Sequence, residues 1–163
     1  VKKIKKKIID LRKQKENILM SININNFLPS NYIDYYISSN ERRLIVDFDK
    51  FKKLKKPLII PFSRLKKYLN KIKNIEILNY GVNLGNYFHA KNESCVLPSN
   101  LSIGYALALC AIGSVKKIIL AGFDGYKNED YINYENQILF KQFKKSYPKI
   151  NIKFMAKHKI SRF

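Results

Sequence analysis

The fold class is decided by the stretch Lys116-Lys117-Ile118-Ile119-Leu120-Ala121-Gly122-Phe123-Asp124-Gly125-Tyr126. Its apolar run, 118–121, is short and unbroken, which is typical of a strand buried on both faces of a parallel sheet. The two glycines that follow have no Cβ, so the backbone can turn sharply there and lie close to a ligand. The stretch therefore predicts a buried strand that ends in a ligand-accessible loop, 122–126.

Strand and helix patterns alternate on both sides of this stretch. Short runs rich in β-branched and aromatic residues predict further strands at 17–22, 32–38, 58–62, 75–78 and 150–154. Helical spacing or runs of small residues predict helices at 2–15, 48–56, 64–72, 99–113 and 135–147. We expect Ser63 to cap one helix and Ser99 or Asn100 to cap another, and we expect 79–98 to form a long loop. This alternation predicts an α/β fold, a Rossmann-like three-layer sandwich with a mostly parallel sheet.

Length and composition fit one globular domain. A chain of 163 residues, 46% of them hydrophobic, can bury a core of ordinary size, so we expect a single α/β domain over 1–163. The longest apolar run, 103–112, is shorter than the roughly 18–20 residues that cross a bilayer, so no membrane span is predicted. Cys95 and Cys110 have no metal spacing or pairing pattern, which favours a reduced, cytoplasmic chain. Because Val1 opens on a helical pattern, we expect the chain to be the C-terminal part of a longer protein.

The net charge of +20 leaves two interpretations open. A basic surface attracts polyanions by counterion release, and tyrosine and phenylalanine can stack on bases, so a nucleic acid is one candidate partner. The charge, however, comes from 27 lysines spread along the chain and five arginines, whereas nucleic-acid readers use arginine for bidentate contacts. Lysine-rich helix faces that meet solvent are therefore the interpretation we favour.

The loop after the 118–121 strand is the first candidate site. In open α/β sheets ligands bind outside the carboxyl ends of the strands. The Asp124 carboxylate can accept hydrogen bonds from sugar hydroxyls or from an amine, and Tyr126 offers a stacking face and a hydroxyl. The alternative is an ordinary Asp-Gly turn in which Asp124 bonds its own backbone. We include Gly122, Asp124, Gly125 and Tyr126 in the predicted ligand-binding set.

The start of the small-residue helix is the second candidate. A helix N-terminus exposes unpaired N–H groups and favours anions such as phosphate. The hydroxyls of Ser99 and Ser102 and the amide of Asn100 add polar groups there, so these three residues join the set. The alternative is plain helix capping.

Polar residues also follow the first two predicted strands. Arg42 and Arg43, just beyond Asn40, suit a phosphate or carboxylate, or they are ordinary surface charges. Asn25 lies in a run of asparagines after the first strand, which can orient a polar ligand or form a turn. Asn25, Asn40 and Arg42 complete the predicted ligand-binding set.

The imidazoles give no catalytic or metal pattern. His89 lies in the predicted long loop and can approach the site, whereas His158 lies between lysines near the C-terminus. Neither has a serine, aspartate or cysteine at a diagnostic distance. The sequence also contains no Walker loop and no Gly-x-Gly-x-x-Gly motif. We therefore predict no metal and no cofactor in this domain, and we assign no catalytic residue.

The helix and strand around this loop resemble a known family. The segment that begins Ser102-Ile103-Gly104-Tyr105 and runs through Gly113 to the loop 122–126 resembles the helix–strand–loop of bacterial sialyltransferases of the Campylobacter type. The chain is also similar to C-terminal domains of aldolase-like proteins from bacterial surface-polysaccharide gene clusters. In those domains a Gly-Phe-Asp-Gly-Tyr loop precedes an acidic stretch and a glutamate-bearing helix, as 128–130 and 134–136 do here.

The resemblance implies a function in surface polysaccharide (lipopolysaccharide or capsule) biosynthesis. It implies a domain that binds a sugar or nucleotide sugar and is accessory to an attached or partner aldolase-type enzyme. The alternatives are a sialyltransferase-like glycosyltransferase and a basic nucleic-acid-binding domain. If the chain is catalytic, it belongs to an aldolase (lyase) polypeptide or is itself a glycosyltransferase.

The Asp124 loop can be tested by ligand-induced stabilisation. If the loop binds a nucleotide sugar, cytidine nucleotides and nucleotide sugars should raise the melting temperature, because a ligand that binds the folded state stabilises it. Asp124→Ala should abolish that gain in a thermal-shift assay. A gain that is equal in the variant would show that the loop plays no part in binding.

Overall fold

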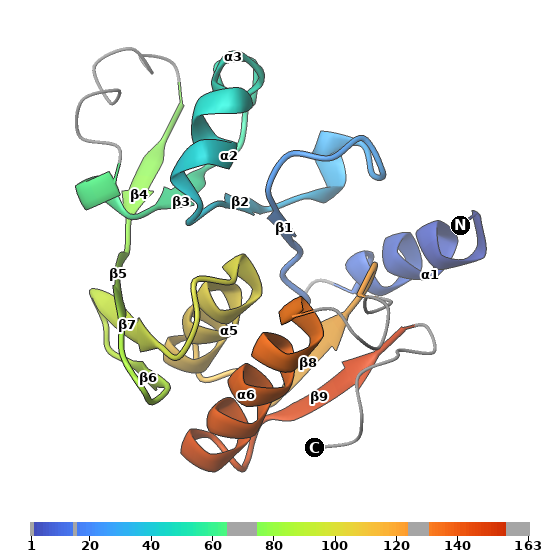
Figure 1. Cartoon of the computed structure of the whole chain (residues 1–163). Helices are drawn as coiled ribbons and strands as arrows, with labels where there is room; N and C mark the ends of the chain where they lie inside the picture. The colour runs from blue at the N-terminus through green and yellow to red at the C-terminus, as the bar shows by residue number, and fades with distance from the viewer. Residues whose placement is uncertain (1, 15, 65–74, 124–130, 156–163) are drawn as a thin grey trace. The chain divides into compact units, whose positions relative to one another are not determined.

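The computed structural model describes residues 2–14, 16–64, 75–123 and 131–155. By its internal contacts the chain divides into two compact units, Val1–Val82 (unit 1) and Asn83–Phe163 (unit 2). Each unit is described by itself, with the elements labelled as in Figure 1. That the whole chain forms one domain stays a prediction.

Unit 1 is built on a four-stranded sheet in which every neighbouring pair is parallel. The strands are β1 (Met20–Ile22), β2 (Tyr35–Ile37), β3 (Leu58–Ile60) and β4 (Ile77–Asn79), and their order in the sheet is their order in the chain. The β1–β2 register pairs Ser21 with Tyr36, and the β2–β3 register pairs Tyr36 with Leu58. The predicted α/β character and the parallel sheet are thereby confirmed.

The connections of unit 1 differ in part from the predicted ones. The described elements are α1 (Lys2–Arg12), the 3-10 turn η1 (Ser30–Tyr32), α2 (Glu41–Val46) and α3 (Phe48–Phe51). Helix α2 was not expected, and α3 ends before the predicted 56. Residues 62–64 are helical, so Ser63 lies inside that segment and not before it, while 65–74 lie outside the described residues.

The core of unit 1 lies between the sheet and helices α2 and α3. Tyr36, Leu58 and Ile60 of the sheet pack with Leu44 of α2 and Phe51 of α3, and all are at most 2% exposed. Sequential strands joined by right-handed crossovers place their connections on the same face of the sheet. The loop between β1 and β2 therefore shares this face with the two helices.

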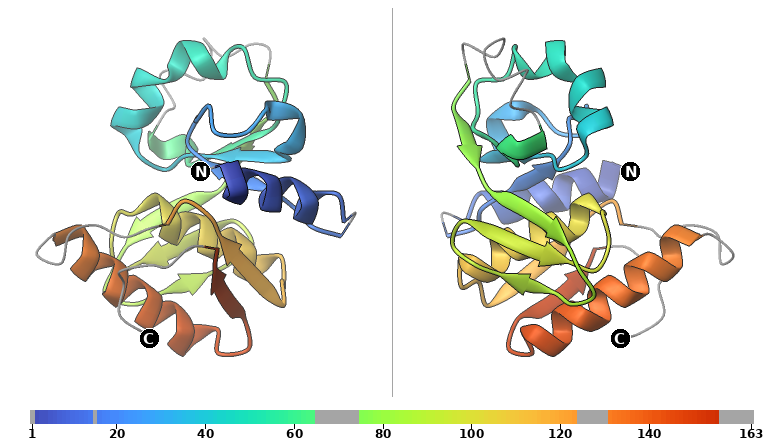
Figure 2. Two further views of the ribbon diagram at one scale, coloured as in Figure 1. Left: turned by 90° about the vertical axis from the view of Figure 1, so that its right-hand side faces the viewer. Right: turned by 60° about the vertical axis from the view of Figure 1, so that its left-hand side comes forward.

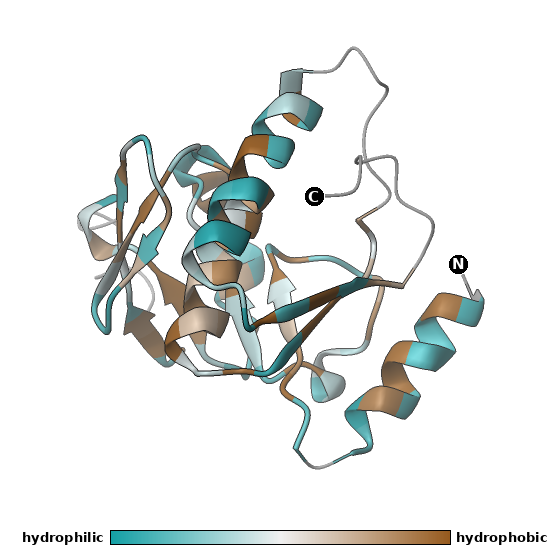
Figure 3. Cartoon of the chain, turned by 90° about the horizontal axis from the view of Figure 1, so that it is seen from below, coloured by the Kyte–Doolittle hydropathy of each residue, from teal (hydrophilic) through white to brown (hydrophobic). Residues whose placement is uncertain are grey.

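Helix α1 is amphipathic, as its lysine-rich sequence predicts. Brown and teal segments alternate along it in Figure 3, and Ile8 is buried while the neighbouring Lys6 and Lys7 are exposed. Arg12, at its last turn, donates to the Asp34 carboxylate, which also accepts from the backbone N–H of Leu19 at 2.8 Å. This carboxylate therefore joins α1 to the starts of β1 and β2.

The predicted long loop at 79–98 is wrong, because the segment contains three strands. They are β5 (Gly81–Leu84), β6 (His89–Ala90) and β7 (Ser94–Leu97), in the order β5-β7-β6. β6 and β7 are antiparallel, with His89 opposite Val96. Along β7 the more buried residues, Cys95 and Leu97, alternate with partly exposed ones. These strands were missed because the Asn, Gly, His and Ser residues of 79–98 interrupt the apolar runs and leave no clear period.

Two helices and a parallel strand pair complete the described part of unit 2. Helix α5 spans Ser102–Ile112, β8 spans Lys117–Leu120, α6 spans Tyr131–Ser146 and β9 spans Asn151–Phe154. β8 and β9 are parallel, and all four elements lie close to the predicted positions. Figure 2 shows α6 (orange) alongside β9 (red), where the Phe140 and Phe154 rings lie 5.9 Å apart.

The C-terminal end of α6 is fastened to β6. The Phe88 ring meets Phe143 edge to face at 5.1 Å, and Ser146 Oγ donates to the Phe88 carbonyl at 2.7 Å. The Tyr147 hydroxyl accepts from the Ala90 N–H at 2.9 Å and donates to the Ala90 carbonyl at 3.3 Å. One side chain thus bonds both backbone groups of a residue on an outer strand.

Helix α5 is buried, as its apolar sequence predicts. Tyr105, Leu107 and Ala108 are at most 1% exposed. Gly104 lies directly against α6, since a Cβ built there would lie 2.9 Å from Leu139 Cδ1. Among the described residues, no helix is both long and apolar enough to cross a membrane.

Replacing Gly104, inside α5, and Gly113, at its C-cap, by alanine should change the stability of the chain in different ways. Alanine favours a helix by about 1 kcal/mol over glycine, but at Gly104 it would overpack against the fully buried Leu139, at a cost of about 1–3 kcal/mol. We expect Gly104→Ala to lower the free energy of unfolding measured by chemical denaturation. Gly113→Ala, at an exposed C-cap with φ −72°, is the matched control and should not lower it. A stabilised Gly104→Ala would contradict the close packing of α5 on α6.

Candidate functional site

The residues that follow β1 and β2 form a polar cluster at the carboxyl edge of the parallel sheet. Asn23 adopts the left-handed backbone conformation, φ 57°, which asparagine tolerates better than most residues. Its backbone N–H donates to the Ile37 carbonyl at 2.8 Å, and its carbonyl accepts from Ser21 Oγ at 3.0 Å. These bonds hold the chain in a sharp turn directly after β1.

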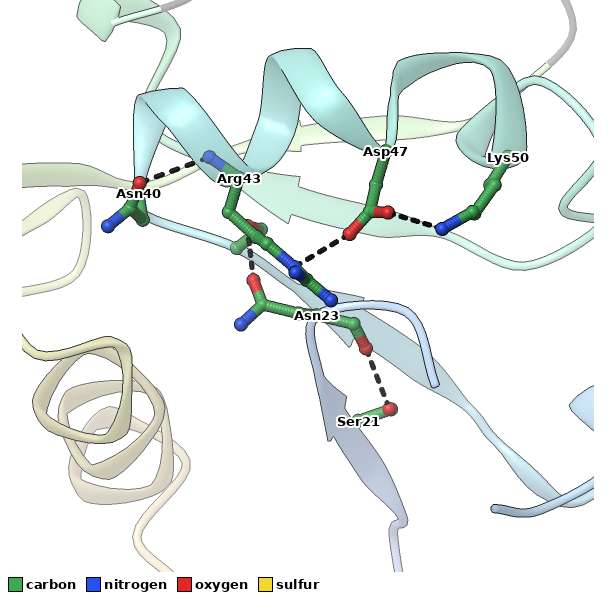
Figure 4. Close-up of polar contacts among 7 residues, drawn as sticks. Ser21, Asn23, Asn40, Arg43, Asp47 and Lys50 are labelled. Carbon is green, nitrogen blue, oxygen red and sulfur yellow. Dashed lines mark hydrogen bonds and ion pairs between the residues drawn. The ribbon is translucent and has the colours of Figure 1, made fainter. Parts of the chain in front are cut away.

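Two asparagine side chains in this cluster are oriented in the same manner (Figure 4). Asn23 Oδ1 accepts from the buried Ser38 Oγ at 2.6 Å. Asn40 Oδ1 accepts from the Arg43 backbone N–H at 3.1 Å, and so caps α2. In each amide the oxygen is held by the protein, while the Nδ2 group has no partner among the described residues. In Figure 4 both amide nitrogens lie on the same side of the strand ends, so the edge presents two oriented hydrogen-bond donors.

A buried carboxylate holds the helix that Asn40 begins. The side chain of Asp47 is 1% exposed; Lys50 Nζ donates to its Oδ1 at 2.7 Å, and Arg43 Nε lies 2.8 Å from its Oδ2 as an ion pair. The sequence predicted that Arg42 and Arg43 could both bind an anion, but the two side chains have different positions. Arg43 serves α2, while Arg42 is exposed at the start of the same helix.

The predicted ligand residue Asn25 uses its amide within its own loop. Its Nδ2 donates to Ser21 Oγ at 2.8 Å, and its Oδ1 accepts from the Phe27 N–H at 3.0 Å. It belongs to the same network as Asn23, because Ser21 bonds both residues. Asn25 shapes the turn after β1, whereas Asn23 carries the outward-facing donor.

A third strand end adds a cation to this edge. Arg64, just beyond β3, donates from Nη1 to the carbonyl of the buried Ser39 at 2.7 Å. The Asn79 side chain, at the end of β4, accepts from the Phe62 N–H at 3.0 Å. The sequence predicted polar sites directly after the first two strands, where Asn23 and Ser38 lie, but it did not point to Arg64. The signal for Arg64 was position alone, since it follows the end of a parallel strand.

In unit 2 the corresponding position is the carboxyl end of β8. Gly122 has φ +70°, and no described atom lies within 4 Å of a Cβ built there. The left-handed conformation explains why a glycine is needed at this point. Asp124, Gly125 and Tyr126 of the predicted site, as well as His158, lie outside the described residues.

The N-terminal ends of α5 and α6 lie at this same end of β8. Helix α5 enters β8 through a short turn and so runs opposite to it, and α6 joins the parallel strands β8 and β9 and must also run opposite to both. Figure 1 shows the two helices side by side, in agreement with the Gly104–Leu139 contact. Ser99, Asn100 and Ser102 are therefore on the same side of unit 2 as Gly122.

The predicted cap of α5 is wrong. The helix begins at Ser102, and the apolar residue Leu101 holds the N-cap position, so neither Ser99 nor Asn100 occupies it. Ser99 is 7% exposed, and its Oγ has no hydrogen-bond partner among the described residues. Asn100 is exposed. A buried hydroxyl without a partner is uncommon in proteins, so Ser99 is a polar group that a ligand or water can satisfy.

Asn136 of α6 is a second such group, which the sequence reasoning did not single out. It is 2% exposed; its Nδ2 donates to the Ile132 carbonyl at 2.8 Å, while its Oδ1 has no partner among the described residues. It lies one turn before Leu139, toward the N-terminal end of α6. A buried asparagine on the apolar face of an amphipathic helix was the available signal.

The described histidine and the cysteines do not form a reactive centre. His89 is exposed on β6, not in the loop that was predicted there. Burial raises the pKa of the Cys110 thiol to about 12, which keeps it protonated and unreactive. Within the described ranges, no group of three or more histidine, cysteine or acidic residues could hold a metal ion.

The role of Asp47 in holding the amide edge can be measured. Asp47→Asn removes the charge that Lys50 and Arg43 share, so we expect the free energy of unfolding to fall by about 1–3 kcal/mol in chemical denaturation. Asp49→Asn is the matched control. Asp49 is exposed, and the hydrogen bond from Lys52 lowers the pKa of its carboxyl. Because solvent screens this exposed pair, Asp49→Asn should leave the unfolding midpoint nearly unchanged. Equal effects of the two substitutions would remove the case for a structural ion pair at Asp47.

Comparison with known proteins identifies no relative. A scan against protein-family models, a search of curated proteins and a search of solved structures each gave no match. The two strand-end clusters are therefore the features of the chain from which a function can be inferred.

Proposed function

We propose that the chain binds a sugar or nucleotide sugar at the carboxyl edge of the parallel sheet in unit 1. The observation that carries this proposal is the pair of amides at Asn23 and Asn40, each held through Oδ1 with Nδ2 left to donate. Sugar hydroxyls and nucleobase carbonyls are neutral acceptors of the kind that such amides bind. The exposed Arg42 beside them supplies a cation for a phosphate.

The chemistry of this edge favours binding over catalysis. Amide and hydroxyl side chains do not ionise near neutral pH, so they are poor general acids and bases, and the nearby Asp47 carboxylate is engaged by two cations. We therefore propose a binding domain that is accessory to an attached or partner aldolase-type enzyme in surface polysaccharide biosynthesis, in keeping with the resemblance of 102–126. The three-layer, Rossmann-like arrangement of the whole chain belongs to the same proposal.

A sialyltransferase-like transferase is the second candidate, favoured by the polar atoms at the ends of α5 and α6. Ser99 Oγ and Asn136 Oδ1 are buried, and both lack partners among the described residues. The first turn of α5 adds the N–H groups that bind an anion. A nucleotide sugar carries both the phosphate and the hydroxyls that such groups would bind.

The amide edge is tested by isosteric substitutions. Asn23→Asp and Asn40→Asp keep the oxygen that Ser38 or the α2 cap requires, and they replace the outward-facing donor by a carboxylate oxygen. We expect each to weaken the binding of cytidine nucleotides or nucleotide sugars by roughly tenfold or more in isothermal titration calorimetry, since a hydrogen bond is lost and a charge is introduced. The melting temperature without ligand should change little.

The control is Asn31→Asp, which makes the same change of charge at an exposed residue of η1. It should bind as the unsubstituted chain does. Nucleotides that bind all four proteins equally would place the site elsewhere and refute the amide-edge proposal. Binding that depends on Asp124 but not on Asn23 or Asn40 would favour the β8 loop instead.

A further inference from the structure

Unit 1 contains a pocket that is separate from the amide donors. It has a volume of about 340 Å³ and is lined by residues 24–26 and 28–30, together with Lys5, Tyr36 and Leu54. Tyr36, Ile24, Leu28 and Leu54 also belong to the core cluster or pack against it, so the floor of the pocket is the core beneath α2 and α3. A volume of this size suits a small molecule rather than a polymer.

Tyr36 lines this pocket. The residue is 2% exposed, and its ring packs in the core. Its hydroxyl bonds none of the residues that the structure describes, and the oxygen itself is not fully buried, so it can donate to a ligand in the pocket. Burial raises the pKa of Tyr36 above its ordinary value, so the hydroxyl is a proton donor at neutral pH.

Lys5 makes the pocket basic. Asp34 pairs with Arg12, and Asp10 lies 3.7 Å from Lys13. Within the described ranges no carboxylate lies within ion-pair distance of Lys5. The residues that line the pocket include no aspartate or glutamate. The Lys5 ammonium and the Tyr36 hydroxyl can both donate hydrogen bonds to a ligand, so the pocket favours a ligand with an anionic group.

The apolar residues that line the pocket indicate what the remainder of the ligand should be. Ile24, Leu28 and Pro29 come from the loop after β1, and Leu54 follows α3. They present apolar surface beside the two donors, while the Asn25 amide is occupied by Ser21 and Phe27. An acid with a compact apolar body would satisfy both halves of the pocket.

We propose that this pocket binds a small organic anion, whose acidic group pairs with Lys5 and accepts from the Tyr36 hydroxyl while its apolar body packs on Ile24 and Leu54. The site does not rest on the proposed function, because it lies over the α2–α3 face of the sheet and uses none of the outward-facing amide donors. It gives the chain a ligand besides any sugar held at the strand ends.

The probes are phenyl phosphate, benzoate and benzyl alcohol, added to the full chain and followed by two-dimensional NMR of the backbone amides. Phenyl phosphate or benzoate should shift residues 24–30 in a saturable manner, and the uncharged benzyl alcohol should not. The comparison of phosphate with carboxylate identifies the acid that fits better. If neither anion shifts these residues, or if benzyl alcohol binds equally well, the proposal is wrong.

The variants are Tyr36→Phe and Lys5→Gln, with Lys6→Gln as the matched control on the exposed side of α1. Each of the first two substitutions should raise the dissociation constant of the anion roughly tenfold, since each removes one hydrogen bond to a charged group. Lys6→Gln should bind as the unsubstituted chain does. Equal weakening by Lys5→Gln and Lys6→Gln would show general attraction to the basic helix and overturn the site. Tyr36→Phe keeps the ring in the core; should it fail to fold, the shifts of 24–30 in the unsubstituted chain and the two lysine variants still decide the outcome.

Discussion

The parallel pairing of β1 to β4 is the constraint on which unit 1 depends. Because all four strands point the same way, their carboxyl ends meet at one edge. The connections from β1 to β2 and from β2 to β3 pack in one core on the same face. The edge collects Asn23, Asn40 and Arg64, which are far apart in the sequence. The face collects the loop after β1 together with α2 and α3, and so creates both the core and the pocket of Tyr36. Two polar sites of different chemistry thus follow from one topology.

In unit 2 a parallel strand pair likewise brings helix ends together. Parallel β8 and β9 require α6 to run back against them, and this brings its N-terminal end beside that of α5. The helices can approach closely because position 104 has no Cβ. Ser99, just before α5, and Asn136, in the N-terminal half of α6, are buried, and each keeps a polar atom without a protein partner in the described ranges. The N-terminal parts of the two helices thus carry two unsatisfied polar atoms.

Helical spacing and short apolar runs were sufficient to predict most helices and the strands of the parallel sheets, and failed for strands β5 to β7. Helices α1, α5 and α6 could be predicted because eleven to sixteen residues favour one structure, and strand β8 because its apolar run is unbroken. β6 and β7 could not, since two to four residues such as Ser94–Leu97 show too little alternation and their pairing is made by tertiary contact. At the candidate sites, the sequence could predict which polar residues are present. It could not predict which of their side chains bond within the protein and which face outward. Asn25 and Arg43 are bound within the protein, whereas Asn23 and Arg42 are outward-facing, and only the local hydrogen bonds separate them.

The Tyr147 hydroxyl has a consequence for how the chain avoids wrong partners. β6 is an outer strand of its sheet, and an unprotected strand edge invites pairing with another polypeptide. By bonding both the N–H and the carbonyl of Ala90, one phenol replaces a neighbouring strand at that residue. The Phe88, Phe143 and Tyr147 rings pack against one another beside it. A side chain at the end of α6 thus occupies backbone groups on the outer strand β6 that could otherwise pair with a strand of another chain.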